Sequence, residues 1–344
     1  MYTRFGDNDI VTRQAQELVT STWTNNTNNL QVVHTSSAQA NFTTATSSGQ
    51  FYIEVYNGVS SDSASEIQYA ISNGHKLGSG SPDFTNDTGS FGLSATRTIY
   101  NQYRQLHFND DTQNFTFGNH TPESIFVINV NRARYKQKLT LGSLNLHIKG
   151  ETQGVDGQTT IHLTEDSVTN GQAGTSNLGP YYNIVSGSNG VLSGSVTNQV
   201  TINGNTSTYG FFYPEAGVIL LNGEAFSSSF GFTYASNTAN KNHETLLNEI
   251  SNSGHFIIDT TEEINSQFYF CRARNDQFNY TNNESFVDTN KNVRFETMKL
   301  NPKVFITTIG LYNDAFELMA IAKLSQPVAK DFTKEALIRV KLDY

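Results

Sequence analysis

The sequence predicts a mainly-β fold built from antiparallel sheets, and three observations lead to this prediction. Hydrophobic residues make up 36% and charged residues 15% of the 344 residues, while Asn, Thr, Ser and Gly supply much of the remainder. Aromatic residues are frequent, with 23 Phe and 16 Tyr, which separates the chain from disordered sequences. Short runs of alternating apolar and polar residues are separated by turn-forming segments. We therefore expect β-sandwich-like domains with two or three short helices, a polar insertion and a C-terminal antiparallel meander.

The N-terminal residues 1–45 are expected to form an arm. They are polar and lack a strong periodic pattern; the segment "DIVTRQAQELVTSTW" fits a weak helix and an extended strand equally well. Such a segment buries little apolar surface by itself, so its order would have to come from contacts with other chains. We expect neighbouring subunits to supply these contacts, with Trp23 and Leu30 as the anchors.

Residues 46–150 contain the first part of the predicted core. The segments "QFYIEVYN" and "EIQYAISNGH" indicate strands at residues 50–57 and 66–75. A helix is predicted at residues 96–108, with Ile99, Tyr103 and Leu106 on one face. The apolar segments "SIFVINVN" and "SLNLHIKG" are expected to pair as antiparallel strands. The basic segment "NRARYKQK" between them is expected to be a solvated connection; a salt bridge to an acidic subunit and a nucleic-acid contact are the alternatives.

Residues 151–208 differ from the rest because turn-forming residues dominate them. We expect a polar insertion that carries a few strands and forms either a surface loop or an arm that contacts neighbouring subunits. The core is expected to return in residues 209–344. Within it, a second helix is predicted at residues 242–250, with Asn242 as its N-cap.

The C-terminal residues 303–344 show the clearest pattern. Apolar residues alternate with a period of two in three consecutive runs, which predicts an antiparallel meander. Asn313 and Asp314 suit the first turn, since both tolerate left-handed backbone geometry. Met319 and Ile321 lie on the face opposite Leu318, so both faces of this strand are apolar. We expect burial on both sides, either within the domain or against another subunit.

Charge and cysteine content narrow the classes of partner. The formal net charge is −9 and the isoelectric point about 5.3, which argues against a direct nucleic-acid or anionic-membrane partner. No apolar stretch approaches the 18 residues of a membrane span, and no secretory signal pattern occurs, so we expect folding in the cytosol. The single cysteine, Cys271, cannot form an internal disulfide and is expected to be a buried thiol.

A search for chemistry finds no catalytic signature. P-loop, nucleophile-elbow, HExxH, GxGxxG and CxxC patterns do not occur. The acidic segments around Asp7 and Asp110 lack the spacing of a calcium loop, and the histidines, His75 and His147 among them, are expected to be surface or packing residues. Adjacent carboxylates at Glu262 and Glu263 leave a glycosidase formally open, because such pairs form in three dimensions. We expect no catalytic residues, no metal site and no cofactor.

The C-terminal segments "FITTIGLYNDAFELMAIAKLSQPV" and "KEALIRVKLDY" resemble the closing hairpin of a family of virion structural proteins in contractile-tailed, T4-like phages of marine bacteria. Upstream segments resemble the same family in the same order: "QYAISNGHKLGSGS", "TIYNQYRQL", "IFVINVNRARYKQKLTLGSLNL", "YGFFYPEAGVILLN" and "FCRARNDQFNYTNN". The segment "IGLYNDAFELMAIAKL" is also similar to the hairpin of N-terminal domains that attach tail fibres to the baseplate. The resemblance covers most of the chain outside residues 151–208.

This resemblance implies a non-enzymatic structural subunit of a tailed-phage virion, placed in the baseplate or tail. It would be made in the host cytoplasm and join baseplate, tail or neck subunits in a multi-copy, ring-forming assembly. A neck or collar protein at the head–tail junction, and a receptor-binding or glycan-degrading tail protein, are the alternatives. The residues expected at subunit interfaces are Trp23, Leu30, Phe305, Leu311, Met319, Ile321 and Tyr344.

Overall fold

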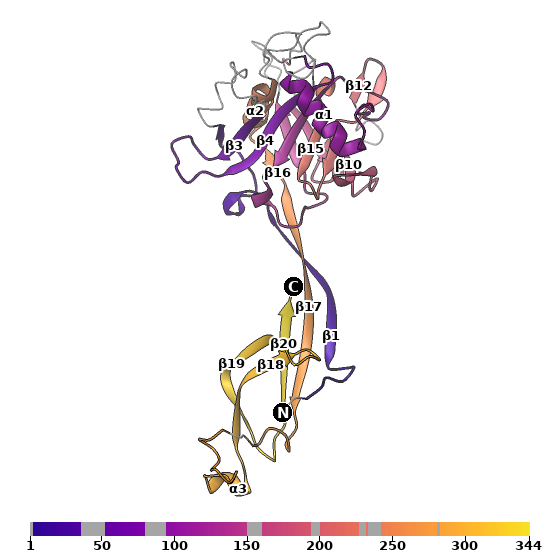
Figure 1. The fold of residues 1–344 in the computed structure, drawn as a ribbon. Coiled ribbons are helices and arrows are strands. Elements are labelled where there is room, and N and C mark those ends of the chain that lie inside the picture. Colours follow the sequence, from indigo (N-terminus) through magenta and orange to yellow (C-terminus); the bar gives the residue numbers. More distant parts are fainter. Residues whose placement is uncertain are drawn as a thin grey trace. The chain divides into compact units, whose positions relative to one another are not determined.

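The computed structural model describes residues 3–35, 52–79, 94–149, 160–193, 200–226, 232, 242–280 and 283–344. It divides into two compact units (Figure 1). Unit 1 consists of Met1–Glu17 and Glu263–Tyr344, and unit 2 of Leu18–Glu262. This division differs from the boundaries expected at residues 45, 150 and 208, because the two terminal parts of the chain combine into one unit.

Unit 2 is built on a curled, half-barrel antiparallel sheet. Along the sheet the strands are β16 (Phe256–Ile257), β7 (Asn145–Lys149), β8 (Thr160–Glu165), β10 (Gly179–Ser188), β14 (Gly210–Tyr213), β15 (Val218–Asn222), β5 (Ser124–Val130), β4 (Ile67–His75), β3 (Tyr52–Asn57) and β2 (Val33–Thr35). β9 (Gly174–Ser176) and β11 (Val191–Leu192) also pair with β10, and β12 (Val200–Ile202) and β13 (Asn205–Ser207) form a separate ribbon. The expectation of a mainly-β, antiparallel fold is confirmed.

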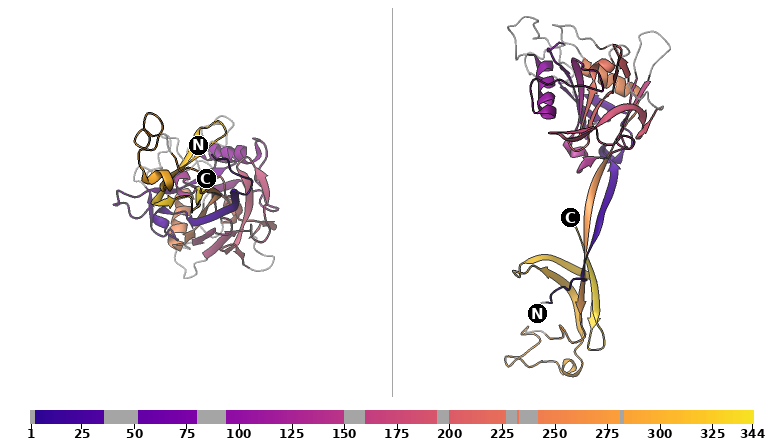
Figure 2. Two further views of the ribbon diagram at one scale, coloured as in Figure 1. Left: turned by 90° about the horizontal axis from the view of Figure 1, so that it is seen from below. Right: turned by 90° about the vertical axis from the view of Figure 1, so that its right-hand side faces the viewer.

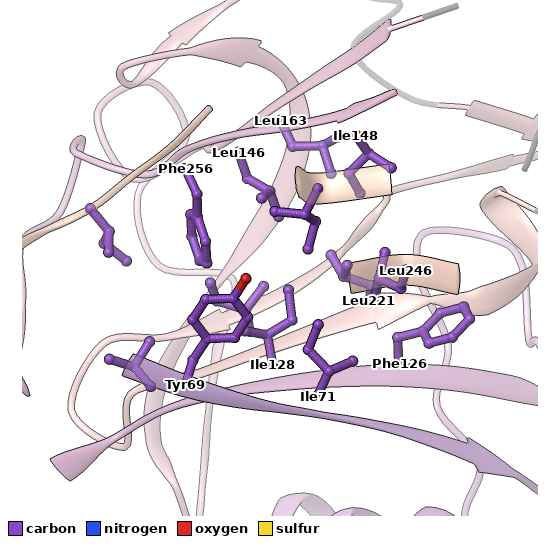
Figure 3. Close-up of a cluster of buried hydrophobic side chains, with 14 of the residues drawn as sticks. Tyr69, Ile71, Phe126, Ile128, Leu146, Ile148, Leu163, Leu221, Leu246 and Phe256 are labelled. Carbon is purple, nitrogen blue, oxygen red and sulfur yellow. The ribbon is translucent and has the colours of Figure 1, made fainter. Parts of the chain in front are cut away.

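The curl of the sheet makes unit 2 sandwich-like, because its two halves enclose a common core. Figure 3 shows Leu146, Ile148 and Leu163 from one half of the sheet facing Tyr69, Ile71 and Ile128 from the other. All six side chains are fully buried. A second cluster lies on the opposite face of β5, β14 and β15 and includes Tyr100, Phe115, Val127, Phe211 and Leu220. These central strands are therefore apolar on both faces, which explains their continuous hydrophobic runs.

Three α-helices occur in the described residues: α1 (Ala95–Phe108), α2 (Asn242–Ser253) and α3 (Thr297–Leu300). Figures 1 and 2 show α1 on the outer face of the unit 2 sheet and α2 on the face inside the curl. Short 3-10 helices lie at Thr24–Asn26, Arg132–Arg134 and Gly223–Ala225. Both long helices were predicted, although Asn242 belongs to the first turn of α2 and does not precede it.

Helix α1 lies close to β4, and the residues that it buries differ from those predicted. Its buried residues are Thr96, Tyr100, Tyr103 and His107, whereas Leu106 is partly exposed. A Cβ atom at Gly74 of β4 would lie 2.9 Å from the backbone nitrogen of Tyr100. Glycine at this position therefore permits the close approach of helix and sheet.

Two expectations about unit 2 were wrong. The strands β5 and β7 do not pair with each other; β5 lies between β4 and β15, and β7 between β8 and β16. The segment 151–208 is not a peripheral insertion in its described part, because β8 and β10 are integral strands of the sheet. Its polar composition comes from turns and outward faces, while Leu163, Ile184 and Val185 are buried.

The predicted N-terminal arm is also part of the chain's own fold. Residues 10–21 form β1 (Ile10–Ser21), which pairs with β17 (Asp259–Ala273). Trp23 and Leu30 lie in the core of unit 2, where the Trp23 Nε1–H donates to the Phe256 carbonyl at 2.8 Å. The Trp23 ring packs 4.8 Å from the ring of Phe256 and 5.9 Å from that of Tyr69. A side chain buried in its own core cannot anchor on a neighbouring chain, so that expectation is corrected.

Unit 1 combines an antiparallel sheet with a hairpin. In the sheet, β17 lies between β1 and β20 (Ala336–Asp343). The first residues of β17 belong to unit 2, where Thr260 and Thr261 pair with β6 (Lys138–Leu139). The hairpin consists of β18 (Val304–Tyr312) and β19 (Leu318–Lys330). The three strands expected in residues 303–344 are present. The third does not extend the hairpin, however, because β20 pairs with β17 from Ser266–Asp343 to Ala273–Ala336.

Candidate interaction surface

The β18–β19 hairpin separates its two faces clearly. Leu311 is paired with Ala320, and both lie on the face that packs within unit 1, where Leu311 is 7% exposed. Ile321 is paired with Gly310 on the other face and is 59% exposed. A Cβ atom at Gly310 would lie 2.8 Å from Cε2 of Tyr312, so glycine here leaves room for the tyrosine ring.

The turn of the hairpin is held by Asn313. The amide N–H of Phe316 donates to the Asn313 carbonyl at 3.0 Å, and that of Glu317 donates to Asn313 Oδ1 at 2.8 Å. The left-handed residue of this turn is Phe316, with φ of 60°, and not Asn313 or Asp314 as expected. Left-handed geometry costs a residue with a Cβ about 1–2 kcal/mol. The Phe316 side chain is also 64% exposed, so burial within this chain offsets little of that cost.

The structure divides the predicted interface residues into two groups. Trp23, Leu30 and Leu311 are buried within the chain. Phe305, Met319, Ile321 and Tyr344 are exposed, with Met319 68% and Tyr344 67% accessible to solvent. Only the second group can contact a partner without unfolding.

Further exposed apolar residues on the hairpin were not predicted as interface residues. Together with three of the expected residues they form a surface that we call the hairpin surface: Phe305, Tyr312, Phe316, Leu318, Met319 and Ile321. At about 200 Å² for a fully exposed large side chain, their exposed fractions correspond to about 700 Å². This area is a sum over the whole hairpin, since Phe305 pairs with Ala329 at the end away from the turn, whereas the other five residues lie at or near the turn. The sequence signal for the missed residues was their position beside the turn, where exposure is common.

Unit 1 has little core of its own. Among its described residues, the buried apolar side chains are Val287, Leu311, Ala336 and Val340. Exposed large apolar residues are more numerous and include Ile10, Val11, Phe295, Leu300 and Leu337 outside the hairpin. Two-stranded and three-stranded sheets need an apolar face packed against something else to be stable. Unit 1 therefore exposes apolar surface that would ordinarily form a core.

One part of unit 1 is held by a buried lysine. Lys330, at the end of β19, is fully buried. Its ammonium donates to the Asn275 carbonyl at 3.1 Å, to Asn279 Oδ1 at 2.6 Å and to the carbonyl of Gln277. Three acceptors match the three donors of an ammonium group, which compensates for its removal from water. This contact fixes the base of the hairpin to residues 275–279.

Charge is distributed unevenly between the units. Unit 1 contains 13 basic and 13 acidic residues, whereas the whole chain has a formal net charge of −9. Unit 2 therefore carries the entire net charge of −9. The apolar surface lies on the unit that has no net charge.

Unit 2 contains a stack of three histidines. The ring of His147 lies 3.8 Å from that of His162 and 4.0 Å from that of His255, centroid to centroid. Asn145 lies between two of them, with Oδ1 3.0 Å from His147 Nε2 and Nδ2 2.7 Å from His255 Nε2. Burial and the neighbouring imidazoles lower the pKa of His147 to about 4, so this imidazole is neutral at pH 7. Imidazole lone pairs lie in the ring plane, so parallel rings do not direct them to one point.

The buried carboxylates of unit 2 have structural partners. Glu165 accepts hydrogen bonds from the amides of Gly142 and Ser167, and Asp166 accepts from Asn183 N at 3.0 Å and from Asn170 Nδ2 at 3.0 Å. These bonds hold the turn after β8 against β10. No group of three His, Cys, Asp or Glu side chains that could hold a metal ion occurs among the described residues.

The remaining candidates from the sequence have local roles. Arg134 of the basic segment forms an ion pair with Glu66 at 2.7 Å within unit 2. Cys271 is partly buried, and burial raises the pKa of its thiol, which leaves little reactive thiolate at neutral pH. A cavity of about 350 Å³ beside Tyr69 and Arg132 is lined by a single carboxylate, that of Glu54. It lacks the facing pair that a glycosidase uses.

Comparisons with known proteins give no assignment: no family model matches the chain, and no curated protein or solved structure matches it significantly. Within the described part of the chain, no helix combines the length and apolar character needed to cross a membrane.

Proposed function

We propose that this protein is a non-enzymatic structural subunit of a tailed-phage virion, placed in the baseplate or contractile tail. The observation that carries the proposal is the hairpin surface, whose exposed apolar side chains sum to about 700 Å² on a unit with little core of its own. An isolated soluble enzyme has no use for such a surface, whereas an assembly subunit requires one. The resemblance of the hairpin segment to virion proteins supports the same assignment.

The chemistry of the described residues fits this role. The buried carboxylates Glu165 and Asp166 are saturated by hydrogen bonds, and the histidine stack holds α2 and β16 near β7 and β8. These groups organise the fold of unit 2. We propose that unit 2 presents a stable body and that unit 1 makes the contacts of assembly.

The test is the fate of the protein in phage particles. We expect mass spectrometry of purified particles from the encoding phage to detect this chain, and cross-linking to join it to baseplate or tail subunits. A phage carrying Met319→Asp and Ile321→Asp should make the protein in normal amounts but release particles that lack it. Truncation after Asn301 is a less specific test, because it also removes β20 from its pairing with β17.

Two outcomes would contradict the proposal. The first is absence of the chain from purified particles while it accumulates in infected cells. The second is depolymerisation of capsular polysaccharide or lipopolysaccharide by the purified protein, abolished by replacement of a carboxylate. The second outcome would favour the glycan-degrading alternative.

A further inference from the structure

We propose that the hairpin surface binds a second copy of this chain, and that Phe316 at the hairpin tip is a principal contact. This inference rests on the proposed function, since it names the partner of the same surface. On this inference, the protein forms a homo-oligomer before any other virion component joins it.

The first argument is that unit 1 requires a partner. Only Val287, Leu311, Ala336 and Val340 are buried apolar residues in its described part, whereas the exposed apolar side chains of the hairpin sum to about 700 Å². A standard protein–protein interface buries about 800 Å² on each partner. Burial of the exposed apolar side chains of the hairpin would supply most of this area.

The second argument concerns which partner fits. Contact between identical copies places equal charges near one another, so a surface with a large net charge opposes self-association. Unit 1 has 13 basic and 13 acidic residues, and the net charge of −9 resides on unit 2. On the hairpin itself, Asp314 and Glu317 stand against Lys323, because the ammonium of Lys330 is buried. A basic or acidic partner protein would find no net attraction here, whereas a second copy meets no net repulsion.

The third argument is the conformation of Phe316. It combines left-handed backbone geometry, with φ of 60°, and a side chain that is 64% exposed. Within one chain, glycine or asparagine would suit this position better. A bulky aromatic residue in this conformation gains most when another molecule buries its ring. Aromatic residues buried at the centre of an interface are among the strongest contributors to binding.

The experiment is the oligomeric state of the purified full chain in the absence of other phage proteins. One chain has a mass of 38.1 kDa. Sedimentation equilibrium and native mass spectrometry should give a mass of two or more chains at micromolar concentration. A monomer at concentrations up to about 100 μM would overturn the inference, because the interface would then be too weak to form in assembly.

Matched variants locate the contact. We expect Ile321→Asp to weaken self-association by at least about tenfold. Val59→Asp is its control, because Val59 is 57% exposed and Ile321 59% exposed, but Val59 lies in unit 2. Phe316→Gly should also weaken self-association by about tenfold while leaving the thermal stability of the dissociated chain unchanged or raised, since it relieves the left-handed geometry.

The outcomes separate this inference from the proposed function. An oligomer that both Ile321→Asp and Phe316→Gly leave intact places the contact elsewhere and overturns the role of the hairpin surface. A monomeric protein that is nevertheless found in phage particles overturns self-association alone, and the surface then binds a different virion protein. An oligomer that is absent from particles overturns the proposed function and leaves self-association standing.

Discussion

Replacement of Trp23 tests the corrected position of the N-terminal segment. The indole is fully buried, packs against Tyr69 and Phe256, and donates a hydrogen bond to the Phe256 carbonyl. An aromatic side chain that buries about 200 Å² at about 25 cal/mol per Å² contributes about 5 kcal/mol. We expect Trp23→Ala to lower the free energy of unfolding of unit 2 by about 3–5 kcal/mol, the range typical of Trp-to-Ala changes in cores.

Trp23→Phe separates the ring from its hydrogen bond. The Phe256 carbonyl also accepts a hydrogen bond from the Leu30 amide at 3.1 Å, so the change does not leave this carbonyl unpaired. We therefore expect a smaller loss of about 1–2 kcal/mol, from one hydrogen bond and part of the ring area.

Urea unfolding followed by far-ultraviolet circular dichroism measures both variants. Fluorescence cannot serve, because Trp23 is the only tryptophan of the chain. Val32→Ala is the control within the same segment, since Val32 is 56% exposed and should change stability by less than about 0.5 kcal/mol. If Trp23→Ala were as mild as this control, the segment would not pack on unit 2 and the original expectation of an arm would return.

Three further predictions concern titration and buried polar groups. His107 and His147 have pKa values lowered to about 4 from an ordinary 6.5, so the unfolded chain binds more protons than the folded chain between these pH values. The free energy of unfolding should therefore fall by about 1–2 kcal/mol per histidine as the pH drops from 6.5 to 4. His147→Gln should reduce this dependence on pH in denaturation measured at several pH values. Asp166→Ala should destabilise unit 2 by about 1–2 kcal/mol in thermal unfolding, because two donors of the partly buried Asn183 lose their acceptor, and Asp166→Asn should cost less. Lys330→Met should speed proteolysis at residues 275–279 without changing the melting of unit 2; equal cleavage of both proteins would contradict the structural role of the ammonium.

Local patterns in the sequence were sufficient to predict single helices and strands. The strands at residues 50–57 and 66–75 and the helix at 96–108 were predicted because their periodicity is a property of neighbouring residues. The hairpin β18–β19 was predicted for the same reason. The exposed positions of Met319 and Ile321 follow directly from alternation on this hairpin.

Contacts between segments far apart in the sequence could not be predicted in this way. The pairing of β20 with β17 rather than β19 depends on contacts between segments about 70 residues apart. The burial of Trp23 depends on Tyr69 and Phe256, so the polarity of its own neighbours was misleading. The left-handed conformation of Phe316 could not be anticipated from propensity, since Asn313 and Asp314 are the usual choices for it.

The division of the chain into two units also determines the order in which they can fold during synthesis. Unit 2 is continuous from Leu18 to Glu262, whereas the unit 1 sheet needs β1, made early, and β20, made after all of unit 2. The 82 residues from Glu263 to Tyr344 take a ribosome about 4–16 s at about 5–20 residues per second. Unit 2 can therefore fold on the ribosome first. The β18–β19 hairpin, with its exposed apolar residues, then emerges after the strands of unit 2 are paired, so it cannot aggregate with them.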